Sequence, residues 1–436
     1  MKALYMLVLL LLRAGIRVAS LFDSKASLFV TGRKNLLSRL TQSLQAKPGP
    51  VIWFHCASLG EFEQARPVIE LVRKDFRNYH ILLTFFSPSG YEVQKNYTHA
   101  DHVFYLPWDT AANARKFMAT VKPALAVFVK YEFWHFFAQE IRRQQVPLVS
   151  ISAIFRKDQV YFKRYGSFYR NILKNFSYFF VQNDESIRLL KSIGITNCTR
   201  AGDTRFDRVV EITRQGGKIE IAQRFKGDTQ CWVIGSSWPE DIDMLLPLIN
   251  GSEGKLKFII APHEIGESAL VSLEKSLVVP SVRFSKAQST AQSPPAYAEA
   301  AAGRQSTAKD SSLEDATVLI VDTIGHLSKL YQYGEFAYVG GAFGRGLHNI
   351  LEAACYGIPI FFGNEDNDKY QEAMDLIMRG GAFEISDYAD FKKKYELLIS
   401  RPENYLLACE VTSQYVQENL GATQVIMGHF HKLLKS

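Results

Sequence analysis

Residues 51–61 read VIWFHCASLGE, and this stretch decides the fold. Its apolar run at 51–54 predicts a short buried strand. A loop with the small residues Ser58 and Gly60 follows, and the apolar spacing of residues 61–76 predicts a helix. Strand, short loop and helix together form the repeating unit of a parallel α/β sheet.

Similar apolar runs, separated by stretches of helix length, recur along the chain. They predict further strands at residues 81–85, 103–106, 124–129, 148–151, 178–181, 232–235, 258–261, 317–321, 336–339 and 358–362. This alternation is typical of doubly wound parallel sheets. Because 436 residues suffice for two domains of about 200 residues each, we predict an α/β protein with two doubly wound domains.

Composition indicates where the domains begin and end. We predict a first domain at 23–210, a polar linker at 211–230, a second domain at 231–420 and a final helix at 421–436. Residues 285–315 are rich in Ser, Ala, Gln and Pro and lack apolar periodicity, which predicts a flexible insertion.

The overall composition excludes several classes of protein. With 47% hydrophobic and 22% charged residues, the chain has the balance of a globular protein and not of a polytopic membrane protein. The five cysteines are scattered and form no CxxC pair, so neither a disulfide framework nor a zinc site is indicated. A net charge of +7 favours an anionic partner, such as a phospholipid surface, a nucleotide or a phosphorylated substrate.

The amino terminus is apolar. Residues 3–12 form an unbroken apolar run, followed by Arg13 and Arg17. We interpret residues 1–22 as a membrane anchor, because a helix that enters one leaflet can hold its arginines at the headgroups. The run is shorter than the ~20 residues of a full span. Whether the anchor spans the bilayer or lies on it stays open, and a buried core helix is the alternative.

Glu61 is the first candidate for chemistry. It follows a predicted strand, and ligands of parallel sheets bind at the carboxyl ends of the strands. A carboxylate there is able to act as a general base, but the first turn of a helix also favours a carboxylate for its dipole alone. The position leaves both roles open. The sequence has no GxGxxG after a strand and no GxxxxGK[ST], which disfavours a dehydrogenase or a P-loop enzyme.

Three more segments follow predicted strands: TFFSPSGYE at 84–92, YLPWD at 105–109 and YEFW at 131–134. Together with HCASLGE at 55–61 they resemble the Kdo transferase family of lipopolysaccharide synthesis, where Kdo is 3-deoxy-D-manno-octulosonic acid. The resemblance implies a GT-B glycosyltransferase with two Rossmann-like domains facing a central cleft. It also implies inverting, metal-independent transfer of Kdo from CMP-Kdo to lipid IVA, the lipid A precursor, with Glu61 as catalytic base.

The segment GGAFGRGLHNILEA at 340–353 is similar to the donor-binding segment of the family, and its glycine-rich loop leads into a helix predicted near Asn349. The loop GSSWPE at 235–240 is a second candidate for holding a phosphate. The chemistry of these two loops makes Ser236, Ser237 and Gly341 candidates for the donor phosphate. The resemblance implies that CMP-Kdo also contacts Pro262, His263, Gly325, His326, Leu327, Asn349, Ile350, Leu351, Glu352 and Glu372. His263 and His326 stand where many relatives carry arginine and glutamate.

The acceptor-side candidates are Ser58, Gly60, Ser87, Gly90, Glu132 and Arg156. Arg156 begins the stretch 156–176, which interleaves cations with aromatic residues. Such a stretch suits lipid phosphates or stacked bases, and a helix with a basic face and a buried aromatic face is an equal alternative. Combined with the apolar amino terminus, the pattern favours acceptor or lipid phosphates over nucleic acid.

The expected partners are CMP-Kdo, a lipid A precursor and the cytoplasmic face of the inner membrane, with no cofactor, metal or nucleic acid. Two rival interpretations remain. One is another GT-B enzyme, such as a nucleotide-sugar epimerase or a different lipid glycosyltransferase. The other is a non-catalytic basic protein that binds a membrane surface or RNA, which would not need Glu61 together with Asn349 and Glu352.

Overall fold

The computed structural model describes residues 1–292 and 313–434. The chain forms two compact units. Unit 1 comprises Met1–Arg208 and Asn419–Ser436, and unit 2 comprises Val209–Glu418. The end of the chain therefore returns to the first unit.

In its described part, unit 1 contains a seven-stranded sheet with the order β3-β2-β1-β4-β5-β6-β7, and every neighbouring pair is parallel. The strands are β1 (Val51–Cys56), β2 (His80–Phe85), β3 (His102–Tyr105), β4 (Pro123–Val129), β5 (Leu148–Ala153), β6 (Tyr178–Val181) and β7 (Cys198–Arg200). The order of the strands changes direction between β1 and β4. Loops at such a switch point are where doubly wound sheets bind their ligands.

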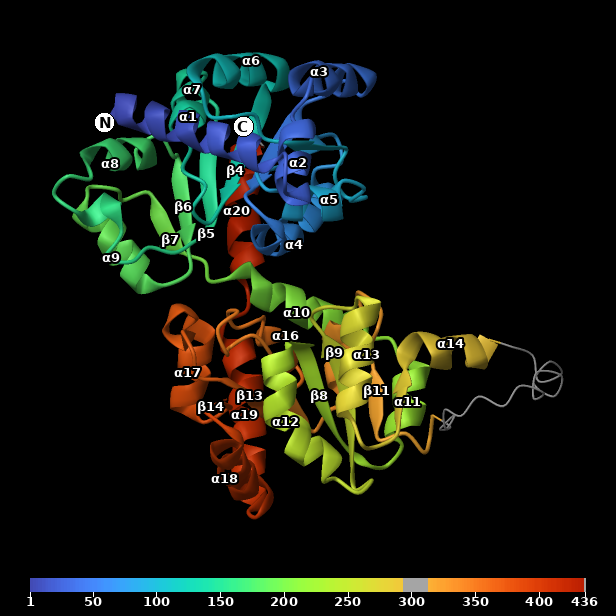
Figure 1. Ribbon diagram of the computed structural model, residues 1–436. Coiled ribbons are helices and arrows are strands. Elements are labelled where there is room, and N and C mark those ends of the chain that lie inside the picture. Colours follow the sequence, from blue (N-terminus) through green and yellow to red (C-terminus); the bar gives the residue numbers. More distant parts are fainter. Residues whose placement is uncertain (293–312, 435–436) are drawn as a thin grey trace. The chain divides into compact units, whose positions relative to one another are not determined.

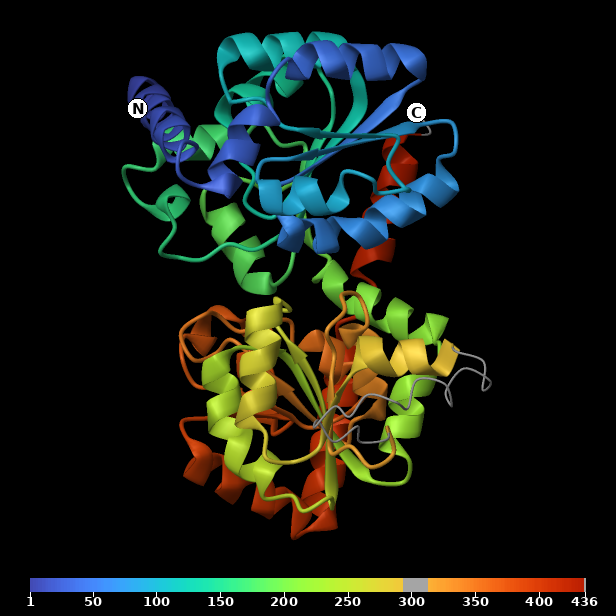
Figure 2. The ribbon, with the colours of Figure 1, turned by 45° about the vertical axis from the view of Figure 1, so that its right-hand side comes forward.

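Helices cover both faces of this sheet (Figure 1). They are α1 (Lys2–Ala19), α2 (Ser24–Thr31), α3 (Leu36–Ala46), α4 (Leu59–Asp75), α5 (Pro88–Gln94), α6 (Ala111–Val121), α7 (His135–Arg143), the 3₁₀ turn η1 (Val160–Phe162), α8 (Ser167–Leu173), α9 (Asp184–Ser192), α10 (Thr204–Gln215) and α20 (Ala422–Leu434). Leu40 of α3 and Phe117 of α6 pack with Trp53 of β1, and Figure 2 shows the two helices side by side. Phe62 of α4 and Phe430 of α20 pack against the opposite face. Burial on both faces explains why the strands are apolar runs without alternation.

Asp207, in α10, helps to hold α20 in unit 1. Its carboxylate accepts hydrogen bonds from the backbone N–H groups of Gly421 and Thr423, each at 2.7 Å. The amides at the start of a helix have no partner within the helix, so a carboxylate at this place stabilises it.

Unit 2 repeats the architecture: among its described residues, seven strands form a parallel sheet with the order β10-β11-β9-β8-β12-β13-β14. The strands are β8 (Gln230–Ser237), β9 (Leu256–Pro262), β10 (Ser281–Arg283), β11 (Val318–Ile320), β12 (Phe336–Val339), β13 (Ile360–Gly363) and β14 (Ala382–Ile385). The order changes direction between β8 and β12. Trp232 of β8 stacks on Phe336 of β12 in the core, with ring centroids 4.8 Å apart.

The helical segments of unit 2 are mostly placed between successive strands in sequence, as a doubly wound fold requires. They are α11 (Glu220–Lys226), α12 (Pro239–Asn250), α13 (Glu267–Ser276), α14 (Phe284–Gln292), α15 (Leu327–Leu330), η3 (Tyr331–Tyr333), α16 (Leu351–Ala354), η4 (Asn367–Lys369), α17 (Gln371–Arg379), α18 (Tyr388–Ile399) and α19 (Pro402–Glu418).

The prediction of two parallel α/β domains is confirmed. Every predicted strand is present, with each end within two residues of its predicted place. Three strands were not predicted: β7, β10 and β14, which are all edge strands of three or four residues with charged or polar members. Short, polar edge strands are common because they resist pairing with other chains, and they leave little apolar signal.

Three local predictions need correction. The expected linker at 211–230 contains the end of α10 and the whole of α11, since Ile221, Ala222 and Phe225 provide a buried face. Of the expected insertion at 285–315, residues up to 292 belong to α14, and residues 293–312 lie outside the described residues. The stretch 156–176 is not one helix but the turn η1 followed by α8.

Helix α1 covers most of the predicted anchor at 1–22, and none of its residues is buried. Tyr5 links it to the rest of unit 1, because its hydroxyl donates a hydrogen bond of 2.6 Å to Asp109. Leu7, Leu10 and Leu11 are exposed. Within residues 1–292 and 313–434, no helix combines the length and apolarity needed to cross a membrane.

Candidate active site

His55, at the end of β1, lies at the switch point of unit 1 and is fully buried. Its Nε2 lies 3.0 Å from Oε2 of Glu132, in the loop after β4. The indole N–H of Trp134 donates to the same carboxylate oxygen at 2.7 Å. On its other side, Nδ1 of His55 lies 3.0 Å from the hydroxyl of Thr84 and 3.1 Å from its carbonyl.

These contacts indicate where the protons of the pair lie. The Thr84 hydroxyl donates to the carbonyl of Phe54 and accepts from Trp53, so it acts as an acceptor toward His55. Nδ1 of His55 therefore carries a proton. The indole N–H of Trp134 lies within hydrogen-bond distance of both Nε2 of His55, at 3.2 Å, and Oε2 of Glu132. Trp134 therefore joins the two members of the pair at the mouth of the sheet.

Glu61 lies in the first turn of α4 and forms a capping box with Ser58. Its Oε2 accepts the backbone N–H of Ser58 at 3.1 Å and also the hydroxyl of Ser58. Among the described residues, the other carboxylate oxygen, Oε1, makes no hydrogen bond. The structural role at the helix start is therefore real, and it leaves one oxygen of Glu61 available for chemistry.

The other acceptor-side candidates lie in different surroundings. The backbone N–H of Ser87 donates to the carbonyl of Ala57 at 2.7 Å, which joins the loops after β2 and β1. Gly60 is exposed next to Glu61, and Arg156 is exposed on a different loop. Gly90 is a packing residue, because a Cβ at this position would lie 2.3 Å from the ring of Phe85. The side chain of Phe85 therefore explains the glycine at position 90, and its role as an acceptor-side candidate stays a prediction.

The switch point of unit 2 is built around Asp241, a buried carboxylate in the first turn of α12. It accepts hydrogen bonds from the backbone N–H groups of Trp238 (2.8 Å) and Gly341 (3.0 Å) and from the hydroxyl of Tyr338 (2.7 Å). Burial raises the pKa of Asp241, while these hydrogen bonds oppose the shift. The carboxylate thereby ties the glycine-rich loop after β12 to the loop after β8.

Two glycines are required where these loops meet. A Cβ at Gly340 would lie 2.4 Å from the carbonyl oxygen of Ser236 and 2.6 Å from Asp241. Gly341 has a φ of +97°, which side-chain residues rarely adopt. The backbone can therefore turn tightly at the carboxyl end of β12, in the manner of loops that hold phosphates.

A stack of rings lines the same end of the sheet. Trp238 stacks on His263 with centroids 4.3 Å apart, and His263 lies 4.8 Å from His348. The indole N–H of Trp238 donates to Nε2 of His348 at 3.3 Å, so this nitrogen is unprotonated. In agreement, burial and the neighbouring His263 lower the pKa of His348 to about 4. Arg345 lies 4.9 Å above the ring of Trp238.

The remaining donor-side candidates are not equally placed. A cavity of about 380 Å³ within unit 2 is lined by Ser237 and Pro262. Leu327 packs close to Gly235 of β8. The rings of His326 and Phe284 lie side by side, with their centroids 5.1 Å apart. Gly325 has a φ of +94° and open space around it. Ser236 also adopts a positive φ, of +52°.

Asn349 and Glu352 lie together, with the side-chain amide of Asn349 donating to Glu352 at 3.2 Å. The helix predicted near Asn349 is short: α16 begins only at Leu351 and has four residues, so Asn349 precedes it. Ile350 and Leu351 are 1% and 0% exposed, so only their backbone is able to reach a ligand. Glu372 is buried at the start of α17. In the described ranges, no cluster of His, Cys, Asp or Glu has the arrangement of a metal site.

Comparison with known proteins adds to this geometry. A family model described as 3-deoxy-D-manno-octulosonic-acid transferase (kdotransferase) matches residues 34–208. The chain is 27% identical over 358 residues to the 3-deoxy-D-manno-octulosonic acid transferase of Aquifex aeolicus, with 80% of this chain and 86% of that protein covered. The enzyme of the same name from Rickettsia felis is 26% identical, with coverage of 82% and 73%. These matches support the Kdo transferase family for this chain.

Among solved structures, the UDP-GlcNAc 2-epimerase of Neisseria meningitidis bound to UDP-GlcNAc has a TM-score of 0.59 to this chain at 14% identity, covering 88% of this chain and all of that one. At this identity the likeness concerns the fold alone, and it agrees with the predicted GT-B class. The matches with Kdo transferases support a glycosyltransferase of lipopolysaccharide synthesis, as the motifs predicted.

Several residues of the site have no clear signal in the sequence. His55 and Trp134 were read only as parts of motifs, although they hold Glu132 from both sides. His55 and Glu132 are 77 positions apart, and only the pairing of β1 with β4 brings them together. Asp241 was likewise overlooked. The signal that could have revealed it is Pro239 followed by acids, because proline is common at the first position of a helix and a carboxylate suits the free amides of the first turn.

Proposed function

We propose that this enzyme transfers Kdo from CMP-Kdo to a lipid A precursor, with inversion and without a metal ion. The observation that carries the proposal is the match of the Kdo transferase model to residues 34–208, which include both Glu61 and Glu132. Unit 2 binds the donor in this proposal, and unit 1 provides the base. The reaction takes place at the cytoplasmic face of the inner membrane, with the exposed apolar side chains of α1 in the interface.

Glu61 is the proposed base. The acceptor hydroxyl attacks the anomeric carbon of Kdo, the bond to CMP breaks on the opposite face, and Glu61 takes the hydroxyl proton. Its Oε2 is held by Ser58, which fixes the carboxylate, while Oε1 is not hydrogen-bonded within the described structure. A positioned general base contributes about 10²–10⁴-fold to such a step.

Glu132 is proposed to act beside the same reaction. His55 and Trp134 hold its carboxylate, and its side chain is 13% exposed. This arrangement fixes the carboxylate close to solvent. Its proposed task is to bind the acceptor sugar and to stabilise the positive charge that develops on Kdo.

In unit 2, the leaving CMP requires a site for one phosphate and one base. The tight loop at Gly340 and Gly341 offers backbone amides, and Ser237 has a buried hydroxyl without a hydrogen-bond partner in the described structure. The stacked rings of Trp238 and His263 provide a flat face for a base. We propose these groups as the donor site, because a metal-free enzyme must offset the departing phosphate charge with amides and hydroxyls.

The test is direct. Purified full-length protein in detergent is incubated with CMP-Kdo and a tetraacylated, bisphosphorylated lipid A precursor in the presence of EDTA, and products are followed by mass spectrometry. We expect a product heavier by one or more Kdo units. A parallel incubation with UDP-GlcNAc tests the epimerase rival, and epimerised sugar without Kdo transfer would overturn the proposal.

A further inference from the structure

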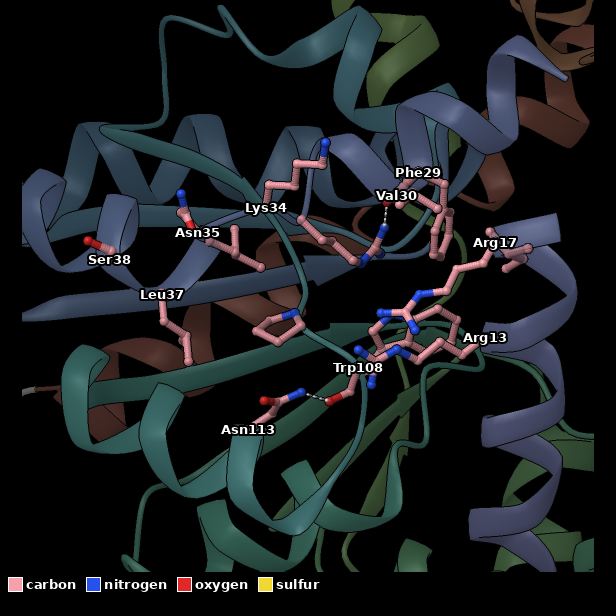
Figure 3. A pocket seen from close by; sticks show the side chains of 14 residues that line it. Arg13, Arg17, Phe29, Val30, Lys34, Asn35, Leu37, Ser38, Trp108 and Asn113 are labelled. Carbon is pink, nitrogen blue, oxygen red and sulfur yellow. Dashed lines mark hydrogen bonds between the residues drawn. The ribbon is translucent and has the colours of Figure 1, made fainter. Parts of the chain in front are cut away.

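Two adjoining cavities lie beside α1 in unit 1. The first, of about 510 Å³, is lined by side chains that include Arg13, Arg17 and Arg33 (Figure 3). The second, of about 350 Å³, is lined on one side by Met6, Leu9 and Leu10. Both linings contain Arg13 and Trp108, so the cationic cavity continues into the apolar one.

The cationic cavity lacks a matching negative charge. In Figure 3, the side chains of Arg13 and Arg17 extend from α1 toward Trp108. Arg33 donates hydrogen bonds only to backbone carbonyls, those of Leu106 (2.9 Å), Phe29 (3.0 Å) and Phe86 (2.6 Å). No carboxylate among the described residues lies within ion-pair distance of these three arginines.

The surroundings of Arg33 raise the free energy of its charged form. Its guanidinium lies 3.7 Å from the ring centroid of Phe29, and burial lowers its pKa to about 9. A bound anion would offset this cost, since a buried charge is stable only when it is paired.

The surrounding sequence concentrates the positive charge of the whole chain. Residues 1–47 contain eight Lys and Arg residues and a single acid, Asp23, which gives this segment the same net charge of +7 as the full chain. Asp23 is itself used, because its carboxylate caps α2 through the N–H of Ala26 at 2.6 Å. The field around α1 therefore attracts anions.

The second cavity suits a hydrocarbon chain. Besides the three α1 residues, its walls include Ala111 and Phe136. Asp109 also lines it, but its carboxylate is 1% exposed and accepts hydrogen bonds from Tyr5 and from the backbone of Phe136 and Phe137. This acid is therefore already satisfied and does not repel an apolar ligand.

We propose that the two cavities together bind one anionic phospholipid of the bilayer, with its phosphate between Arg13 and Arg17 and an acyl chain along Met6, Leu9 and Leu10. A guanidinium group donates two parallel hydrogen bonds to the oxygens of a phosphate. The transfer of an acyl chain from water into an apolar cavity is favourable in free energy. The site goes beyond the transfer reaction, because it uses neither Glu61 nor the donor loops. It selects the phospholipid that the enzyme binds at the membrane surface.

Binding to monomeric short-chain lipids tests the proposal without any transfer activity. The full chain is titrated calorimetrically with dihexanoyl phosphatidylglycerol, with dihexanoyl phosphatidylcholine and with inorganic phosphate. Because the site needs both charge and chain, we expect phosphatidylglycerol to bind at least about tenfold more tightly than either other probe. Equal affinity for inorganic phosphate would reduce the site to a phosphate site, and equal affinity for phosphatidylcholine would remove the role of the arginines. Either result overturns the proposal.

Two matched pairs of variants locate the site. Arg13→Gln/Arg17→Gln should weaken phosphatidylglycerol about tenfold or more, whereas Arg77→Gln/Lys191→Gln removes the same charge from exposed places in unit 1 and should have no effect. Ala111→Trp should fill the apolar cavity and weaken the lipid but not phosphate, whereas the exposed neighbour Ala112→Trp should not. If the two members of either pair bind the lipid equally well, the proposal is contradicted.

The acceptor is the remaining competitor, since a lipid A precursor also carries phosphates and acyl chains. Competition titrations separate the two sources. If the precursor displaces phosphatidylglycerol one for one, and phosphatidylglycerol inhibits transfer competitively, the cavities belong to the acceptor and the bilayer-lipid assignment is wrong. We expect the two lipids to bind independently.

Discussion

The switch points of the two units have the same topology, but different chemical groups hold them together. In unit 1, side chains hold side chains: His55 and Trp134 bind Glu132, and Ser58 binds Glu61. In unit 2, the buried Asp241 holds backbone amides, and glycines bring the loops together. The first arrangement presents partly exposed carboxylates for proton transfer. The second presents amides and stacked rings, which suit a nucleotide.

The comparison predicts that unit 2 depends most on Asp241. Asp241 accepts hydrogen bonds from two backbone N–H groups and from the hydroxyl of Tyr338, and Asp241→Ala leaves all three donors without this partner. At about 1–3 kcal/mol for each buried unsatisfied group, we expect a loss of at least about 3 kcal/mol in the free energy of unfolding, together with loss of CMP binding. Asp243→Ala, an exposed position on the same helix, is the control. Urea denaturation measures both, and equal stability of the two variants would refute the central role of Asp241.

In unit 1, the corresponding prediction concerns the indole of Trp134. Trp134→Phe keeps an aromatic ring beside Phe86 but removes a donor to Glu132. A hydrogen bond to a charged group contributes about 1.5–3 kcal/mol, and we expect a stability loss of that order with reduced transfer. Trp108→Phe serves as the control, because its indole N–H has no hydrogen bond in the described structure. Unchanged activity of Trp134→Phe would show that the position of Glu132 does not matter.

The loop of unit 2 should tolerate no side chain at Gly340. Gly340→Ala forces a Cβ against Ser236 and Asp241, and such overpacking costs about 1–3 kcal/mol. We expect weaker CMP binding by calorimetry while the spectrum of unit 1 tryptophans stays unchanged. Gly266→Ala is the matched control, since nothing lies within 4 Å of a Cβ there and its φ is −65°. Native affinity in Gly340→Ala would place the donor elsewhere.

The smallest expected effect is a pH dependence of unit 2. The pKa of His348 is lowered to about 4 in the folded chain, and it returns to its ordinary value of about 6.5 on unfolding. Between these values the unfolded chain binds more protons, so stability is present above pH 6.5 and is lost as the pH falls toward 4. His348→Gln should flatten the unfolding free energy over this window. An unchanged pH profile would contradict a neutral, buried His348.

The sequence predicted the fold well because parallel strands buried on both faces are continuous apolar runs. It failed at β7, β10 and β14, where edge positions need few apolar residues, and at α11, whose apolar positions Ile221 and Phe225 are diluted by charged neighbours. For the site, motifs led to Glu61 and Asn349. The partnership of His55 with Glu132 has no local signature, because it exists only after β1 and β4 have paired.

The most direct test of the account compares two substitutions of Glu61 in single-turnover transfer from CMP-Kdo. Glutamine keeps the oxygen that caps α4 but cannot take a proton, whereas alanine loses both functions. We expect both variants to lose about 10²–10⁴-fold in transfer rate and both to bind CMP. Only Glu61→Ala should lose about 0.5–2 kcal/mol of stability. A Glu61→Gln enzyme that transfers Kdo at the native rate would show that Glu61 is only a helix cap and that the base is another group.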